Sequence, residues 1–414
     1  MTTSAFKVRI APSLREVDAV QWDLCANPLA FAEPCGGKGD NHAARQQDAV
    51  APEGERRERF DPFVSHAFLD ALETTHCVGP KTGWTVSHVL VEDAAGRLVA
   101  AAPTYIKTHS MGEYVFDYGW AEAYERAGID YYPKMQVAVP FTPVTGRRLL
   151  VSEAGGEAAR DALIAGLRAW RAKIGASSIH VTFPTREDWE AMGASGFLQR
   201  TGKQFHFINK GYADFEAFLA DLASRKRKMI RRERKDALAN GIEIELLSGA
   251  AITESHWDAF FKFYMDTGSR KWGRPYLTRG FFSQIGATMP EHVLLVMAKR
   301  QDRYIAGAIN FIGRDALYGR NWGCVEDHPF LHFEVCYYQA IDYAIRHGLA
   351  RVEAGAQGEH KLARGYGAVP TFSAHDIADR RFARAIDDFL ARERLAIDEE
   401  LGEYAEMAPF KKDA

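Results

Sequence analysis

Apolar and polar residues alternate over two stretches of the chain, and each stretch predicts an antiparallel β-hairpin. The first is "WTVSHVLVEDAAGRLVAAAPTYIKT", residues 84–108, and the second is "EHVLLVMAKRQDRYIAGAINFIG", residues 291–313. In both, two runs rich in β-branched residues flank a polar turn. Residues 164–184 and 338–356 each predict a helix, a short loop and a strand, because helical apolar spacing gives way to a β-branched run.

These segments recur in the same order, which predicts two copies of one mixed α/β unit with partly antiparallel sheets. We place the first unit at residues 1–209 and the second at residues 210–414, which ends in a C-terminal helix. The two hairpins are 206 residues apart, whereas the later strands are only 173 residues apart. The first unit therefore holds 33 additional residues after its hairpin.

The additional residues include the segment "YVFDYGWAEAYERAGIDYYPKM", residues 114–135, in which seven of 22 residues are aromatic. Charged residues are mixed among the rings, which is unusual for a core helix. Two interpretations stay open: a flap that packs on the body of the unit, and a wall of amphipathic rings that binds a substrate. In the second interpretation, the side chains that line the acceptor channel are Tyr114, Asp117, Trp120 and Tyr124.

The composition is that of an ordinary globular protein with one unusual segment. Hydrophobic residues make up 47% and charged residues 26% of the chain, and the formal net charge is −3. This charge excludes a nucleic-acid binder that acts through its whole surface, although a local patch remains compatible. Residues 32–59 are rich in Gly, Pro, Gln and charged residues without apolar periodicity, which predicts a flexible insertion.

The sequence predicts a cytoplasmic protein. The first residues contain no apolar segment typical of a signal peptide, and no stretch approaches 18 uninterrupted apolar residues. The five cysteines are odd in number and show no CxxC spacing, so we expect free thiols in a reducing compartment.

A strand, a loop and a crossover helix within a partly antiparallel sheet are the layout of the GNAT acyltransferase fold. In that fold, a Gly-rich turn holds the coenzyme A pyrophosphate on backbone amides at a helix N-terminus. The equivalent turn of the second unit, residues 321–335, has no glycine after Gly323 and carries Glu326 and Asp327. The first unit instead offers Gly146, Arg147 and Arg148, and we predict that a coenzyme A site, if present, uses these three residues.

The richest polar segment is "GAQGEHKLARGYGA", residues 355–368, which follows a predicted strand that ends at Glu353. We expect Glu353 or His360 to act as a base or proton shuttle, and Lys361 and Arg364 to meet an oxyanion or a phosphate. The expected supporting residues are His332 and Glu334, which would orient them, together with Trp322 and Gln357 on the substrate side. A buried polar network that only joins two loops is the alternative. A metal site from His328, His332, Glu334 and His360 is a further alternative, but these residues show no established zinc spacing, so we predict no metal.

Residues 224–235, "SRKRKMIRRERK", carry eight basic residues and a single acid on a predicted helix. We expect the cations to lie nearly all round the helix, with Met229 and Ile230 in contact with the body of the protein. One interpretation is a solvated helix paired with acidic neighbours. The other is a docking site for phosphates, as on tRNA or a nucleotide-linked substrate.

Several long motifs resemble the FemAB-like family of bacterial proteins, which are associated with peptidoglycan biosynthesis or recognition. They are "DPFVSHAFLDALE", "GEYVFDYGWAEAYERAGIDYYPKM", "VAVPFTPVTGRRLL", "LHFEVCYYQAIDYAI" and "GAQGEHKLARGY", and the resemblance extends from about Phe60 to Ala378. It implies two tandem GNAT-like acyltransferase domains. It also implies a transferase that moves an aminoacyl group from aminoacyl-tRNA onto a cell-wall precursor.

We therefore expect an N-acyltransferase or aminoacyltransferase that acts on an amine of a peptide or small molecule. Acyl-coenzyme A and aminoacyl-tRNA are the two candidate donors. The alternative from another class is a non-catalytic GNAT-like protein that recognises a cell-wall fragment or a partner, since both expected cradle positions lack the Gly-rich motif.

Overall fold

The computed structural model describes residues 6–28, 60–270, 275–355 and 358–411. These residues form two compact units. Unit 1 takes its described residues from 1–32, 63–203 and 370–400, and unit 2 takes them from 33–62, 204–369 and 401–414. The division differs from the predicted one at residue 209, because the chain returns to unit 1 at residue 370. The cause is strand pairing, since Ser373 lies opposite Thr182 in an antiparallel ladder.

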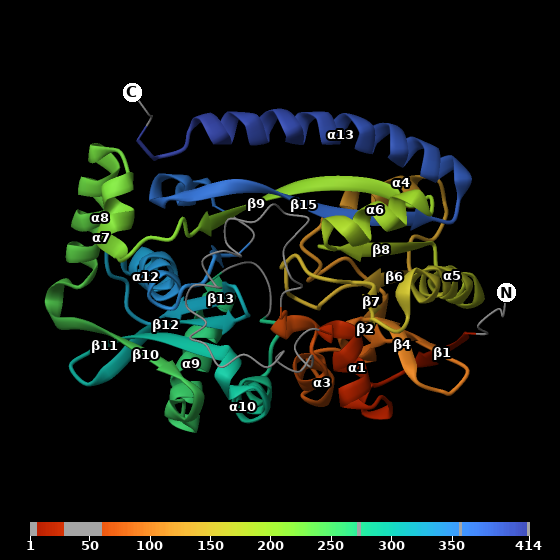
Figure 1. Cartoon of the computed structure of the whole chain (residues 1–414), viewed down its shortest axis with the longest axis horizontal. Helices are drawn as coiled ribbons and strands as arrows, with labels where there is room; N and C mark the ends of the chain where they lie inside the picture. The colour runs from red at the N-terminus through yellow and green to blue at the C-terminus, as the bar shows by residue number, and fades with distance from the viewer. Residues whose placement is uncertain (1–5, 29–59, 271–274, 356–357, 412–414) are drawn as a thin grey trace. The chain divides into compact units, whose positions relative to one another are not determined.

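Unit 1 contains a four-stranded sheet and part of a larger mixed sheet. The strand order of the first is β1-β3-β4-β7, and that of the second is β9-β15-β8-β6-β5-β2. The strands are β1 (Lys7–Ala11), β2 (Trp84–Val86), β3 (His88–Glu92), β4 (Leu98–Ala102), β5 (Thr104–Lys107), β6 (Lys134–Val137), β7 (Leu150–Val151), β8 (Ser178–Thr182), β9 (Leu198–Ile208) and β15 (Tyr366–Ile377). The helices are α1 (Ala19–Ala26), α3 (His66–Thr74), α4 (Tyr118–Arg126), α5 (Gly156–Ile174), α6 (Arg186–Ala194) and α13 (Arg380–Glu406). Figure 1 shows β9 and β15 side by side.

The predicted hairpin at residues 84–108 forms, but each of its arms divides into two strands that join different sheets. The inner parts β3 and β4 pair with each other, and the outer parts β2 and β5 pair in the larger sheet. The change occurs at Ser87 and Pro103, where the Ser87 amide donates to the Thr104 carbonyl at 2.9 Å. Proline has no N–H to donate, so it fits the point where one ladder ends and another begins.

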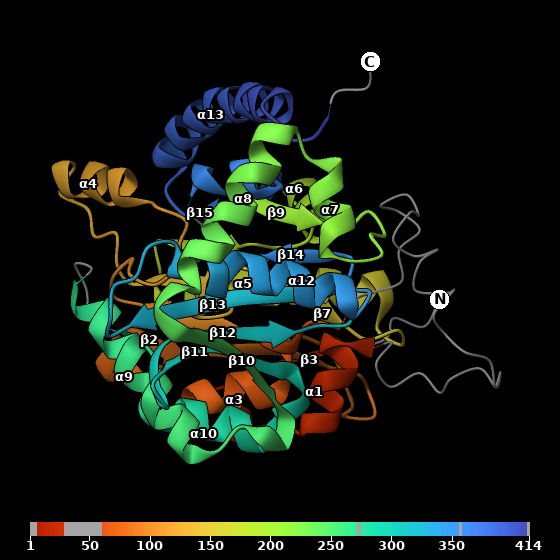
Figure 2. The ribbon, with the colours of Figure 1, turned by 90° about the vertical axis from the view of Figure 1, so that its left-hand side faces the viewer.

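Unit 2 is built on the order β10-β11-β12-β13-β14-β9-β15. Its further strands are β10 (Ile242–Ser248), β11 (Val293–Arg300), β12 (Arg303–Ile312), β13 (Ala316–Cys324) and β14 (Arg351–Glu353). Its helices are α7 (Phe215–Asp221), α8 (Ser224–Ala237), α9 (Glu254–Arg270), α10 (Arg279–Thr288), α11 (Leu331–Phe333) and α12 (Gln339–Arg346). A π-helical segment (Glu334–Tyr338) joins α11 to α12, and a 3-10 helix, η9, spans Glu359–Arg364. Figure 2 shows α9 and α10 on one side of strands β10–β13 and α12 on the other.

The strands β13 and β14 are parallel neighbours over only three residue pairs, from Ala316–Arg351 to Tyr318–Glu353. Strand β13 continues to Cys324, whereas β14 ends at Glu353, so the two strands separate after this point. We call this place the fork. A bulge precedes it, because Ile309 pairs with Asn321 while Asn310 pairs with Gly319. This arrangement of antiparallel strands followed by a short parallel pair is the layout that the sequence predicted for a GNAT-like unit.

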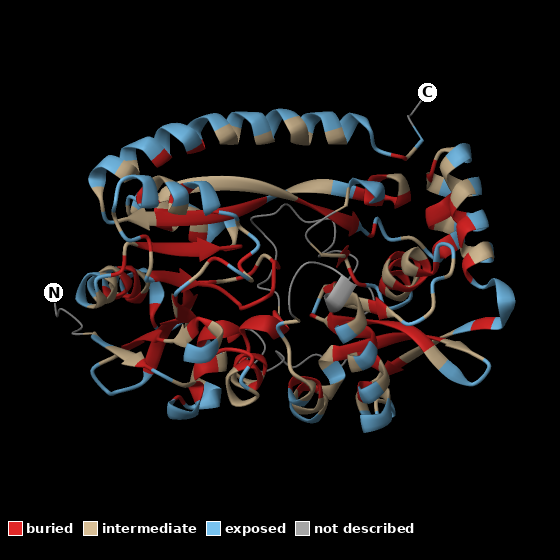
Figure 3. Cartoon of the chain, turned by 180° about the vertical axis from the view of Figure 1, so that it is seen from behind, coloured by how far each residue is buried: buried red, intermediate tan, exposed pale blue. Residues whose placement is uncertain are grey.

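The core of unit 2 lies between the sheet and α12. Alternation along β12 places Ala306 and Ala308 in this core, and α12 contributes Ile341 and Ala344. Figure 3 shows buried residues along the strands and exposed residues over much of α13. Removal of one isoleucine side chain such as Ile341 from water contributes about 2 kcal/mol to folding. The predicted period-2 and helical patterns therefore mark the residues that hold the sheet and α12 together.

The close approach of α9 to β13 depends on Gly323. A Cβ atom at this position would lie 2.1 Å from the Phe263 carbonyl oxygen, which belongs to the backbone and cannot turn away. We expect Gly323→Ala to lower the free energy of unfolding by about 1–3 kcal/mol, as overpacking does. Denaturant unfolding followed by tryptophan fluorescence measures this loss. The matched control is Gly402→Ala, at a helical glycine with open space around it, which should gain up to about 1 kcal/mol. Equal stability of the two variants would contradict this packing.

Candidate functional site

The predicted polar loop brings Tyr337, His360, Lys361 and Arg364 together, and we call these four residues the loop cluster. The Tyr337 hydroxyl lies 3.0 Å from His360 Nε2. The Lys361 ammonium donates to the Gly355 carbonyl at 2.8 Å, and Arg364 Nη1 donates to the His360 carbonyl at 2.7 Å. His360 is exposed, whereas Lys361 and Arg364 are buried. The cluster therefore presents one accessible imidazole above an inner layer of cations.

Local backbone structure accounts for this arrangement. Residues 334–338 form a π-helical segment, which places an extra residue in one turn and is frequent at functional sites. This segment carries Tyr337. On the other side, Gly358 has φ 118°, and an added Cβ would lie 2.4 Å from the His360 ring, so only glycine fits. These two deviations from regular helix bring the phenol and the imidazole within hydrogen-bonding distance.

The protonation of the loop cluster suits proton transfer near neutral pH. Partial burial and the neighbouring Arg364 and Lys361 charges lower the pKa of His360 below its usual 6.5. Burial lowers the pKa of Lys361 to about 8. At pH 7, His360 is therefore neutral and able to accept a proton, while most Lys361 side chains are still charged.

Arg364 braces the loop and does not face an open site. Its Nη2 donates to both carboxylate oxygens of Glu233 at 2.8 and 2.9 Å, and its guanidinium lies 3.6 Å from the Phe333 ring centroid. Glu233 also accepts a hydrogen bond from the Tyr338 hydroxyl. Both ends of the guanidinium have partners within the protein, and a contact of Arg364 with a substrate stays a prediction. Glu233 is the single acid of the basic segment 224–235.

The remaining predicted residues of unit 2 have different surroundings. Glu353 is buried and accepts from Arg351 Nε at 2.7 Å, so its carboxylate balances a buried guanidinium. Glu334 is buried and paired with Arg234 at 3.0 Å and with Gln339 at 2.7 Å. The rings of Trp322 and Tyr337 both pack on His332, at centroid distances of 5.2 and 5.3 Å. The geometry therefore favours His360 over Glu353 as the base, and it gives Glu334 a role in holding α8.

No group of three or more His, Cys, Asp or Glu residues is placed to hold a metal ion within the described parts of the chain. His328 is paired with Glu326 at 3.0 Å, and Glu334 is paired with Arg234, so these two members of the alternative metal set have other partners. Gln357, a predicted substrate residue, lies outside the described residues.

Unit 1 contains a second polar group, the ion cluster, formed by Lys107, Glu113, Asp117 and Lys134. All four side chains are at most 2% exposed. Lys134 donates to Glu113 at 2.7 Å and also to Asp117, while Lys107 lies 3.6 Å from Glu113 and 3.5 Å from the Trp84 ring centroid. Burial of four charged side chains is costly unless they are paired, so this cluster is held by mutual compensation.

Hydrogen bonds extend the ion cluster into the sheet. The Tyr131 hydroxyl donates to Asp117 at 2.6 Å and lies 3.2 Å from His180 Nε2. His180 Nδ1 in turn lies 2.8 Å from His375 Nδ1. Burial opposes the charge on Asp117, but Lys134 outweighs this effect and lowers the pKa of Asp117 to about 2. Burial lowers the pKa of His180 to about 3, so the two imidazoles are neutral members of this chain.

The aromatic segment at residues 114–135 packs mainly on its own unit. Trp120 and Tyr124 are buried in a small core with Ile386 and Leu390 of α13, and the Tyr124 ring stacks on Phe382 at 3.9 Å. This burial favours the packing flap over the channel wall, and a role of Trp120 and Tyr124 in a channel stays a prediction. Only Tyr114 of the four predicted residues is exposed, and Asp117 belongs to the ion cluster.

The residues of unit 1 that were predicted to bind coenzyme A form hydrogen bonds with backbone groups. Arg147 donates to the carbonyls of Cys25 and Val151 at 2.9 and 2.7 Å, and buried Arg148 donates to the carbonyls of Thr182 and Val144 at 3.0 and 2.7 Å. The Gly146 amide donates to the Phe183 carbonyl at 3.1 Å. These contacts join segments of unit 1, and the binding of coenzyme A by the three residues stays a prediction.

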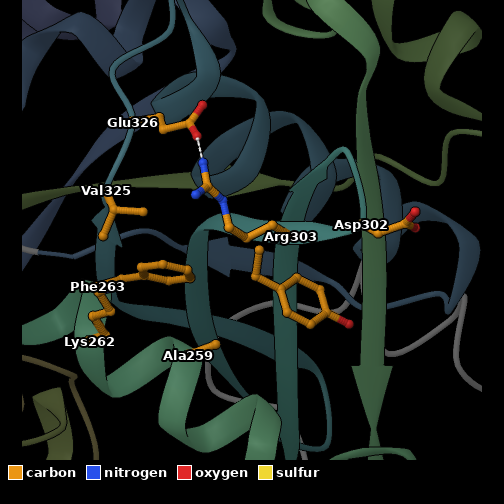
Figure 4. A pocket seen from close by; sticks show the side chains of 8 residues that line it. Ala259, Lys262, Phe263, Asp302, Arg303, Val325 and Glu326 are labelled. Atoms are coloured by element: carbon orange, nitrogen blue, oxygen red, sulfur yellow. Dashed lines mark hydrogen bonds and ion pairs between the residues drawn. The ribbon is translucent and has the colours of Figure 1, made fainter.

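The acidic side chain in the turn after β13 is paired with basic side chains of the protein. Glu326 is bound by Arg300, Arg303 and His328, and the hydrogen bonds from His328 and Arg300 lower the pKa of Glu326 to about 2. A pocket of about 480 Å³ lies beside this turn, and Figure 4 shows side chains that line it, with an ion pair between Arg303 and Glu326. Its lining is Ala259, Lys262, Phe263, Asp302, Arg303, Tyr304, Val325 and Glu326, which includes none of the predicted catalytic residues.

The sequence analysis missed Tyr337 and most of the ion cluster. Lys107 and Lys134 stand at the ends of the apolar strands "TYIK" and "KMQV", where a buried lysine is unusual. A lysine at the end of an apolar strand was therefore the feature of the sequence that could have indicated this cluster. The partners of these lysines come from a loop that has no periodic pattern, so the pairing itself could not be read from spacing.

The ion cluster makes stability depend on pH in a specific direction. Burial lowers the pKa of Lys107 from 10.5 to about 7. Between these values the unfolded chain binds a proton that the folded chain does not, so a higher pH stabilises the folded state, by at most about 1.4 kcal/mol per pH unit. Lys107→Met removes this titration.

We therefore expect the unfolding free energy of the natural protein to increase relative to that of Lys107→Met as pH rises from about 7 to about 10. Denaturant unfolding at several pH values measures it. Lys81→Met, at an exposed lysine of the same unit, is the control and should show no such slope. If the difference in unfolding free energy between the natural protein and Lys107→Met did not change with pH, the lowered pKa of Lys107 would be contradicted.

Comparisons with known proteins give a family and several distant structural likenesses. A search of curated protein sequences found no match. Among solved structures, FemX is 12% identical, with a TM-score of 0.49, covering 83% of this chain and 98% of FemX. The L-PGS structure from Bacillus licheniformis is 9% identical, with a TM-score of 0.48, covering 81% of this chain and 98% of the L-PGS chain. A tandem GNAT protein from the clavulanic acid biosynthesis pathway is 13% identical, with a TM-score of 0.42, covering 90% and 99%.

Residues 13–412 match the model of the FemAB-like family, which is described by peptidoglycan biosynthesis and recognition. The match includes every motif on which the resemblance was based. Within the described residues, no helix is long and apolar enough to cross a membrane. The predicted resemblance and the mixed α/β fold class are confirmed, and the chain belongs to the FemAB-like family.

Proposed function

We propose that the protein transfers an acyl or aminoacyl group onto an amine, with the loop cluster of unit 2 as the transfer site. The observation that carries the proposal is the hydrogen bond between the Tyr337 hydroxyl and His360 Nε2, at the exposed edge of a loop whose cations lie inside. Membership of the FemAB-like family supports the reaction class, since its description includes biosynthesis of a polymer rich in amide bonds.

The chemistry needs a base and a stabiliser of negative charge. The acceptor nitrogen attacks the acyl carbon, and its proton must leave before or during attack. Neutral His360 can take this proton, and the Tyr337 hydroxyl fixes the imidazole orientation. The oxygen of the tetrahedral intermediate becomes negative, and the buried Lys361 ammonium supplies a cation whose field is strong because water is excluded around it. The leaving group then departs with a proton.

The donor is proposed to dock on α8. Contrary to the prediction of cations all round, Ile230, Glu233 and Ala237 are buried, so the helix has an inner and an outer face. The outer face carries a stripe of four exposed cations at helical spacing, which we call the basic stripe: Arg225, Lys228, Arg232 and Lys235. Glu233 and Arg234 on the inner side bind Arg364 and Glu334. A phosphate-bearing donor such as tRNA fits this stripe better than the turn at Glu326.

A non-catalytic recognition protein is the second candidate function. Two observations favour it. Glu326 is paired with Arg303, and Arg147 and Arg148 donate to backbone carbonyls, so at both positions expected to cradle a coenzyme A pyrophosphate the charged groups bind other parts of the protein. The family description includes recognition as well as biosynthesis.

The transfer site is tested with His360→Gln. We expect at least about 100-fold slower transfer, because general-base catalysis contributes 10²–10⁴-fold, with an unchanged melting temperature because His360 is exposed. In the natural protein, the rate should fall as pH drops through the lowered pKa of His360, below 6.5, and the variant should lose this dependence. The control is His347→Gln, at an exposed histidine of the same unit. Full turnover by His360→Gln would remove the proposed base.

The donor class is tested by replacing all four residues of the basic stripe with glutamine. With an aminoacyl-tRNA donor, we expect KM to rise at least about tenfold and its salt dependence to weaken, since each phosphate contact contributes to the salt slope. With an acyl-coenzyme A donor, KM should stay unchanged. The control removes the exposed cations Arg384 and Arg392 from α13. An unchanged KM for every phosphate-bearing donor would exclude docking on α8.

A further inference from the structure

The side chain of Asn310 has no hydrogen-bond partner for either its oxygen or its nitrogen among the described residues, although the residue is only 1% exposed. A buried amide of this kind loses its hydrogen bonds to water and receives none in return. Among the described residues of unit 2, the second buried asparagine behaves differently. Asn209 donates to the Leu349 carbonyl at 3.0 Å and accepts from the amides of Gly211 and Tyr212 at 3.1 and 3.2 Å. Asn310 is therefore an exception that asks for a functional explanation.

Asn310 lies at the fork. It stands on β12 next to the bulge, directly opposite Gly319, which is the first residue of β13 beyond the parallel pair. A Cβ on Gly319 would lie 3.2 Å from the Asn310 oxygen, 3.6 Å from Ala354 Cα and 3.6 Å from the Glu353 carbonyl. The amide is thus aimed across the sheet toward the point where β14 leaves β13 and continues into the loop that carries His360 and Lys361.

The side chains around Asn310 are small. Alternation places Ala308 on the same face of β12, and the neighbours along the row are Gly319 on β13 and Ala354 after β14. This face is the one that packs on the segment of Tyr337 and on α12, because Ala308, Leu317 and Val352 all belong to that core. These small neighbours have no polar side-chain atoms, so none of them can supply the hydrogen bonds that the Asn310 amide lacks.

We propose that Asn310 is a substrate-specificity residue that holds the transferred group, and that this group carries a carbonyl and an N–H donor on adjacent positions, as an aminoacyl group does. This inference rests on the proposed transfer function and names its donor class. The Asn310 nitrogen donates to the carbonyl oxygen, and its oxygen accepts from the α-ammonium group. A simple acyl group satisfies only the nitrogen and leaves the oxygen without a partner, so the site discriminates against it.

The first test uses stability and needs no turnover. Leucine has the same branching as asparagine and places methyl groups where the amide atoms lie. We expect Asn310→Leu to melt at the same temperature as the natural protein or higher, because it removes an unpaired buried polar group. Asn209→Leu, the matched control, breaks three hydrogen bonds and should melt at least about 2 °C lower. An equal loss in both variants would overturn the proposal, since Asn310 would then be a satisfied structural residue.

The second test uses alaninamide and propionamide as probes, which differ only in the α-amino group. The chain has six asparagines, so selective ¹⁵N-asparagine labelling gives few side-chain signals, and Asn310→Leu identifies the Asn310 pair by its loss. We expect alaninamide to shift the Asn310 signals and propionamide to bind about fivefold more weakly, the effect of one hydrogen bond. Equal binding of the two probes, or signals that neither probe moves, would overturn the proposal. If both tests succeed while no donor supports transfer, the proposed function fails and the role of Asn310 in ligand binding stands.

Discussion

The separation of β13 from β14 is the constraint on which the chemistry of unit 2 depends. Three parallel residue pairs hold the two strands together, and beyond Tyr318 and Glu353 their backbones have no further pairing with each other. The residues after each strand must then find other partners. On one side they form the π-helical segment with Tyr337, and on the other side the 3-10 helix with His360 and Lys361.

Buried charges are compensated by different groups in the loop cluster and in the ion cluster. In unit 2, the buried cations of the loop are fixed by Glu233 and by a backbone carbonyl, so the exposed imidazole stands on a rigid base. In unit 1, Lys107, Lys134, Glu113 and Asp117 compensate one another with little solvent. The first arrangement leaves a reactive group accessible, and the second joins an aromatic loop to the sheet. This contrast is why we assign transfer to unit 2.

Much of the fold could be predicted from local patterns, and the site only in part. Period-2 runs identified the hairpins, and the shift from helical to β-branched spacing identified α5, β8, α12 and β14. Glycine and charge density pointed to His360 and Lys361. The packing of Trp120 and Tyr124 could not be predicted, because their partner α13 lies more than 250 residues away in the sequence. The hydrogen bonds of Arg147 and Arg148 could not be predicted either, because an arginine that binds carbonyls looks the same in a sequence as one that binds phosphate. Distant pairing is decided by topology, which single-sequence patterns do not encode.

The return of the chain to unit 1 at residue 370 has a consequence for biosynthesis. Strand β8 receives its partner β15 only after the whole of residues 204–369 has been made, and the small core of Trp120 waits for Ile386 and Leu390. On the ribosome, unit 2 is therefore the first unit whose main sheet has all its strands up to β14, while unit 1 keeps an open edge at β8. A nascent chain that stops before residue 370 exposes that edge and the inner face of α4. Unit 1 thus begins first along the chain, but it completes its part of the larger sheet only after residues 204–369 of unit 2 have been made.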